Sequence, residues 1–130
     1  MPNDNHLESR RRAQRRGRRG ETAAALLLSL KFYRILGRRV RTQLGEIDLV
    51  AKTPSGVICF VEVKARPDFA LATESVLPRQ QKRIARAAQS FLAARPWLAN
   101  APVRFDIVTV SPGSWPRHLR DAWRPDDVGL

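Results

Sequence analysis

Two short segments of the chain decide its fold, because each combines an apolar strand pattern with charged residues. The segments are Gly45-Glu46-Ile47-Asp48-Leu49-Val50-Ala51 and Val57-Ile58-Cys59-Phe60-Val61-Glu62-Val63-Lys64. Turn-forming residues lie between them, in the run Thr53-Pro54-Ser55-Gly56. Two strands joined by such a turn predict a β-hairpin.

The charged residues of this hairpin fall on defined faces, because side chains alternate along a strand. In the second segment, one face carries Ile58, Phe60, Glu62 and Lys64, and the other carries Val57, Cys59, Val61 and Val63. In the first segment, Glu46, Asp48 and Val50 should share one face, with Ile47, Leu49 and Ala51 opposite. A strand that is apolar on both faces is central in its sheet, so its charges must be compensated. Hairpin pairing would bring Asp48 beside Glu62.

The remaining elements predict a small α/β domain. A helix begins near Glu21, with Leu26, Leu27 and Leu30 on one helical face. It ends near Lys31 or continues to Gly37; we prefer the earlier end, followed by a strand over 33–44. Further along, the pattern predicts a loop over 67–78, a helix over 79–98, a strand over 103–110 and a short helix over 117–123. The expected fold is a small mixed β-sheet flanked by helices.

The charge of the chain is strongly positive. Its 130 residues contain 24 Lys and Arg against 12 Asp and Glu, which gives a formal net charge of +12. The expected domain organisation is a flexible basic arm over 1–19 and one domain over 20–130. Since 43% of the residues are hydrophobic, the charge belongs to a chain that can form a core. A polyanion is the natural partner of such a protein.

Several classes of protein are excluded by residue counts. One cysteine cannot form an internal disulfide, and one cysteine with two histidines cannot make an ordinary structural zinc site. The longest apolar run, residues 23–28, is far shorter than a membrane span. We therefore expect a cytoplasmic protein that does not associate with a membrane.

The charged residues of the hairpin suggest a chemistry. Neighbouring carboxylates such as Asp48 and Glu62 repel each other unless a cation lies between them. Mg²⁺ binds one or two carboxylates together with a phosphate group and water, and Lys64 could orient an attacking water or stabilise developing charge. This set therefore suits metal-assisted phosphodiester hydrolysis. A buried ion pair that only fixes the strand register is the structural alternative.

Basic residues provide candidate contacts for nucleic acid. A phosphate-binding surface needs clustered cations, and we select those near the hairpin and at the start of the second long helix. The candidates are Arg38, Arg39, Arg41, Arg66, Arg79, Lys82 and Arg83. No motif for reading bases is visible, so recognition would depend on shape or backbone. Each cluster could also be a solvated face.

Four stretches of the sequence together resemble the YraN-like family of bacterial proteins. They are Gly20-Glu21, residues 45–51, Phe60-Val61-Glu62-Val63-Lys64-Ala65-Arg66 and Arg104-Phe105-Asp106. The spacing from Asp48 to Glu62-Val63-Lys64 also resembles the signature of the PD-(D/E)XK nuclease superfamily, in the branch similar to Holliday junction resolvases. The chain departs from the family pattern at Phe32 and Ala70, where Gly is usual, at Arg39, where Asn is usual, and at Gln80, where Lys is usual.

The resemblance implies a restriction-endonuclease-like fold and a role for each site residue. Asp48 and Glu62 would be metal ligands and Lys64 the catalytic lysine. Glu21 would join the metal site from the first helix, although a carboxylate at a helix start also complements the helix dipole.

The leading hypothesis is an endonuclease that uses Mg²⁺ or Mn²⁺ and acts on DNA, with branched or structured DNA favoured over RNA. A homodimer is compatible with the resemblance. The alternative is a non-catalytic nucleic-acid-binding module that keeps the nuclease fold. A third reading is an interaction protein whose basic arm docks on an acidic partner or on ribosomal RNA.

Overall fold

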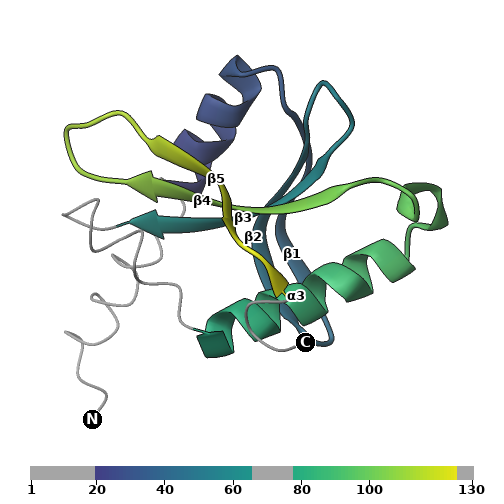
Figure 1. Ribbon diagram of the computed structural model, residues 1–130. Helices are drawn as coiled ribbons and strands as arrows, with labels where there is room; N and C mark the ends of the chain where they lie inside the picture. The colour runs from purple at the N-terminus through teal and green to yellow at the C-terminus, as the bar shows by residue number, and fades with distance from the viewer. Residues whose placement is uncertain (1–19, 66–77, 126–130) are drawn as a thin grey trace, which may run out of the picture.

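The computed structural model describes residues 20–65 and 78–125, which form one five-stranded sheet with helices on both faces (Figure 1). A first helix covers residues 20–30. The elements that follow are β1 (Arg34–Thr42), β2 (Gly45–Lys52), β3 (Ile58–Ala65), α3 (Pro78–Ala93), the 3₁₀ helix η1 (Pro96–Leu98), β4 (Val103–Val110) and β5 (Arg117–Trp123). The arm predicted over 1–19 and most of the loop predicted over 67–78 lie outside the described residues.

The sheet is mixed, and its strands lie in chain order from β1 to β5. Antiparallel pairing joins β1 to β2, β2 to β3 and β4 to β5, whereas β3 and β4 are parallel. The turn between β2 and β3 is closed by Thr53, whose N–H donates to the carbonyl of Val57 at 2.9 Å. The predicted hairpin and the predicted small mixed α/β fold are therefore confirmed.

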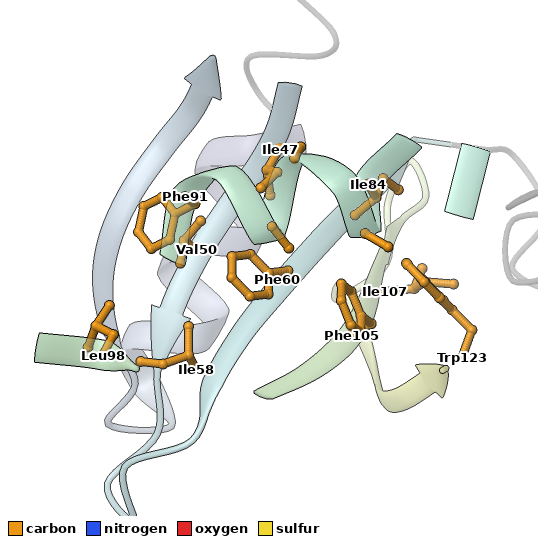
Figure 2. Packing of buried hydrophobic residues seen from close by; sticks show 13 residues of the cluster. Ile47, Val50, Ile58, Phe60, Ile84, Phe91, Leu98, Phe105, Ile107 and Trp123 are labelled. Atoms are coloured by element: carbon orange, nitrogen blue, oxygen red, sulfur yellow. The ribbon is translucent and has the colours of Figure 1, made fainter. Parts of the chain in front are cut away.

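A separate apolar cluster covers each face of the sheet. On one face, Phe60 and Phe105 pack against Ile84 and Phe91 of α3 (Figure 2). On the other face, Val61 and Val108 pack against residues of the first helix. β3 contributes to both clusters, as expected for a central strand that is apolar on two sides.

The first helix ends where the shorter alternative placed it, but its buried face differs from the expected one. Its core contacts come from Ala24, Ala25 and Leu28, while Leu26 and Leu30 are 58% and 60% exposed. Small alanine side chains let the helix lie close to the sheet, so the buried stripe runs through Ala24, Ala25 and Leu28 rather than through Leu26 and Leu30.

The second long helix ends earlier than predicted. α3 stops at Ala93, and Pro96 begins the separate helix η1. A proline lacks the N–H needed inside a helix, and it disfavours helical dihedrals in the residue before it. Arg95 accordingly has φ −132° and ψ 77°, which ends the helix.

The short helix predicted over 117–123 is wrong, because this segment is strand β5. It pairs with β4 through Phe105 and Trp123 and through Ile107 and Leu119. The Trp123 ring stacks on the Phe105 ring with centroids 4.3 Å apart. The open edge of β4 and this buried aromatic pair outweigh the local preference of the segment.

Candidate metal and nucleic-acid site

The candidate site forms where β2 diverges from β3. Leu49 pairs with Val61, and in the described sheet the pairing of the two strands ends there, so Asp48 has no partner in β3. In place of a backbone partner, the Asp48 carboxylate accepts a hydrogen bond from the Val63 N–H at 2.8 Å. The side chain of Asp48 therefore spans the gap that opens between the strands.

This divergence also corrects the predicted alternation in β2. Ile47 packs in the same cluster as Val50, on the α3 side, although strict alternation places them on opposite faces. Leu49 and Ala51 pack on the side of the first helix, as expected relative to Val50. The change of face next to Asp48 coincides with the end of the β2–β3 pairing, where the ladder no longer holds the backbone in register.

Asp48 and Glu62 are brought together as the hairpin register predicted. Burial and the nearby Asp48 charge raise the pKa of Glu62 to about 7. Burial also raises the pKa of Asp48, and the Glu21 charge adds to this effect, against the opposing hydrogen bond from Val63. Both carboxyl groups are therefore poorly compensated by the protein alone.

Lys64 and Gln80 complete the surroundings of Glu62. The Lys64 ammonium lies 3.4 Å from Glu62 Oε1, and these two side chains are 11% and 12% exposed. The Gln80 amide donates to the same oxygen at 3.1 Å from the first turn of α3. In the sequence, Gln80 stands out only as a departure from the family pattern, because its contact with Glu62 depends on how α3 crosses the sheet.

Glu21 lies near this pair but is engaged elsewhere. Its carboxylate accepts a hydrogen bond from Arg39 Nε at 2.5 Å, and it still acts electrostatically on Asp48. Within residues 20–65 and 78–125, no group of three or more His, Cys, Asp or Glu side chains is arranged to hold a metal ion. Glu46 is not part of the site either, since it lies 3.8 Å from Arg41 at the surface.

The Asp48 and Glu62 pair fits a hard divalent cation by its chemistry. Two adjacent carboxylates supply oxygen ligands, and burial and the Asp48 charge, which raise the pKa of Glu62 to about 7, make its ionised form costly without a cation. A cation bound by both oxygens would remove this cost. Asp48 and Glu62 are therefore the residues that would hold Mg²⁺ or Mn²⁺.

The predicted phosphate-binding residues are distributed over two elements. Arg79, Lys82 and Arg83 are exposed at the start of α3, the helix that also carries Gln80. In β1, Arg38 donates to the Thr22 hydroxyl, Arg39 pairs with Glu21 and Arg41 with Glu46. Arg66 lies outside the described residues. The α3 group thus provides exposed cations near Glu62, while the β1 group is partly occupied by contacts within the chain.

A further polar cluster was missed by reasoning from single residues. On the opposite side of the sheet, Arg104 and His118 both bind the buried carboxylate of Asp106. The only signal in the sequence is that Arg104 and Asp106 share one face of an otherwise apolar strand. His118 could not be assigned to them from sequence, because its segment was expected to be helical.

The fold and site define a small α/β domain with a buried carboxylate pair and a lysine at the point where two strands diverge. Residues 20–110 match the family described as uncharacterised protein family UPF0102, and the chain belongs to this family. Similar proteins include UPF0102 proteins of Parvibaculum lavamentivorans, 51% identical over 87% of this chain and 84% of the relative, and of Paramagnetospirillum magneticum, 50% identical over 88% and 91%. A UPF0102 protein of Maricaulis maris is 48% identical over 92% of this chain and 93% of its own length.

Within residues 20–65 and 78–125, no helix is long and apolar enough to cross a bilayer.

Proposed function

We propose that the protein is a metal-dependent endonuclease of the PD-(D/E)XK superfamily that acts on DNA, with branched or structured DNA as the substrate class. The observation that carries this proposal is the buried Asp48 and Glu62 pair beside Lys64. Burial and the Asp48 charge raise the pKa of Glu62 to about 7, and perturbed carboxyl groups of this kind are concentrated at functional sites.

Each residue of the site has its own role in the proposed hydrolysis of a phosphodiester. Asp48 and Glu62 would hold Mg²⁺, which when bound polarises the scissile phosphate and lowers the pKa of water. The Lys64 ammonium, held next to Glu62, can orient the attacking water or donate to the phosphate oxygens. Gln80 fixes the orientation of the Glu62 carboxylate, and the Val63 N–H fixes the orientation of the Asp48 carboxylate. Arg79, Lys82 and Arg83 would bind backbone phosphates on either side.

The test is cleavage of a labelled four-way DNA junction with Mg²⁺ or Mn²⁺. Asp48→Asn and Lys64→Met should each lower the rate by about a hundredfold or more, since each removes a group that acts on the reacting phosphate. Glu46→Gln is the matched control, because it removes a carboxylate from the same strand outside the pair. Full activity in Asp48→Asn would contradict the proposal.

A second candidate is a nucleic-acid-binding module that keeps this fold without cleavage. The observation that favours it is the ion pair between Arg39 and Glu21, which engages a third carboxylate near the site. This candidate predicts salt-dependent binding of DNA with no cleavage under either metal. Replacing Arg39 with Asn, which frees Glu21, separates the two: cleavage that appears only in this variant would assign the parent chain to the binding class.

A further inference from the structure

A second charged cluster lies on the face of the sheet that the first helix covers. Its centre is Asp106, which is fully buried. Its carboxylate accepts two hydrogen bonds from Arg104 at 2.8 Å each, one from His118 at 2.7 Å and one from the Asp121 N–H at 3.0 Å. The negative charge of Asp106 is thus compensated by hydrogen bonds within the protein.

The imidazole of His118 connects this centre to Lys31 at the end of the first helix. Because Asp106 can only accept, His118 Nε2 carries the hydrogen and Nδ1 is left as an acceptor. The Lys31 ammonium lies 3.0 Å from Nδ1. The His118 side chain has no exposed surface, so it is a fixed support for the ammonium group.

Positive charge exceeds negative charge around Lys31. Burial lowers the pKa of Lys31 and the Arg120 charge lowers it further; Asp106 opposes this shift, and Arg104 adds a smaller lowering effect. Arg104 is neutralised by Asp106 through both carboxylate oxygens. Over residues 20–65 and 78–125, neither Lys31 nor the exposed Arg120 has a carboxylate partner. Lys31 and Arg120 could therefore bind an anion from outside the described part of the chain.

An exposed aromatic residue follows Lys31 in the chain. Phe32 is 84% exposed and has φ 67°, in the left-handed region that L-residues with side chains disfavour. Burial of the ring does not compensate for this backbone conformation. The helix ending requires this φ, and a residue other than glycine that is kept here without burial of its side chain is a candidate for a functional contact.

We propose that Lys31, Arg120 and Phe32 form a subsite for a single-stranded segment of nucleic acid. Lys31 and Arg120 bind a backbone phosphate, and the exposed ring of Phe32 stacks on a base. The subsite rests on the proposed function, since it takes the partner to be nucleic acid. It lies at the opposite end of the first helix from Glu21, about 15 Å along the helix axis. A substrate that reaches both places has an unpaired strand next to the point of cleavage.

The experiment measures binding of a short fluorescent oligothymidylate to the full chain by anisotropy, over a series of salt concentrations with EDTA present. Lys31→Ala and Arg120→Ala should each weaken binding and reduce the slope of log K against log salt by about 0.7, the value for one lost phosphate contact on a single strand. Phe32→Ala should weaken binding about fivefold or more with the slope unchanged.

Lys52→Ala is the matched control, because Lys52 is an exposed lysine of β2 outside this cluster. An equal loss of slope in Lys52→Ala would assign the effect to the general positive field and overturn the subsite. Unchanged binding in Lys31→Ala and Arg120→Ala would overturn it as well. Junction cleavage by a parent chain that does not bind the oligothymidylate contradicts the subsite alone, whereas binding that depends on Lys31 without any cleavage contradicts the endonuclease alone.

Discussion

The two sides of the sheet carry buried carboxylates that the protein treats in opposite ways. Glu62 faces α3 beside Asp48, and burial and that neighbouring charge raise its pKa to about 7. Asp106 lies on the side of the first helix; burial alone would raise its pKa, but hydrogen bonds from His118 and Arg104 hold it at about 2. The Asp106 carboxylate is compensated by groups of the chain itself, whereas we propose that the Asp48 and Glu62 pair is completed by a bound cation. On this proposal, the first site stabilises the fold and the second binds a ligand.

The largest effect should follow from breaking the complete cluster. Asp106→Asn removes the only negative charge shared by Arg104 and His118, and leaves Arg104 as a partly buried cation without its partner. We expect a loss of about 3–5 kcal/mol in the free energy of unfolding, the usual range for one partner of a buried pair. Urea unfolding measures it, and a midpoint equal to that of the parent would show that Asp106 contributes no net stability.

Acid should remove part of the same stabilisation. The pKa of Asp106 falls from 3.8 to about 2 on folding, so its contribution is present above about pH 4 and is lost as the pH falls towards 2. The shift corresponds to about 2 kcal/mol. The difference in unfolding free energy between the parent and Asp106→Asn should therefore shrink by this amount between about pH 5 and pH 2. A constant difference over this range would contradict the lowered pKa.

Removing one carboxylate from the Asp48 and Glu62 pair should raise the free energy of unfolding, whereas removing the Asp106 carboxylate lowers it. Glu62→Gln keeps an oxygen for the Gln80 amide and leaves one carboxylate, Asp48, beside one ammonium, Lys64. At about pH 8 without divalent metal, the variant should be more stable than the parent by about 1 kcal/mol, because the repulsion with Asp48 is gone. At about pH 4, below the pKa of 4.5 that Glu62 has in the unfolded chain, the side chain is protonated in both states, so the gain should vanish. Destabilisation at both pH values would show that the pair is a structural ion-pair network.

A divalent metal ion should stabilise the parent protein by binding to Asp48 and Glu62. At tenfold the dissociation constant, Mg²⁺ or Mn²⁺ would add about 1.4 kcal/mol to the unfolding free energy. Thermal unfolding with and without metal measures this, and neither Asp48→Asn nor Glu62→Gln should show the increase. Asp106→Asn is the control, since its carboxylate is already saturated and should leave the metal-dependent gain intact. An equal gain in Asp48→Asn would place metal binding elsewhere.

How far the sequence predicted these two sites depends on the distance between their residues. Asp48 and Glu62 are joined by a hairpin, so strand alternation and a turn were enough to predict that they meet. The Lys31 and His118 contact joins residues 87 positions apart, and no local pattern indicates it. The mistaken helix over 117–123 had the same cause, because β5 is defined by pairing with β4 rather than by its own residues. The break in alternation at Asp48 was also hidden, since it arises from strands that diverge in space.

A similarly small effect concerns Phe32, which follows the end of the first helix and Lys31. Phe32 lies two residues beyond Leu30, where the first helix ends, and the hydrogen bonds from the N–H of Phe32 to Ser29 and from the N–H of Tyr33 to Leu28 form a Schellman ending. Glycine suits this position because φ is 67°. Phe32→Gly should therefore raise the unfolding free energy by about 1 kcal/mol, since the exposed ring contributes little packing. Urea unfolding checks this, with Phe32→Ala as the control that removes the ring and keeps a strained Cβ. If Phe32→Gly gains stability but loses affinity for single-stranded DNA, the strain at this residue is retained for binding; a loss of stability would instead show that the ring packs against its surroundings.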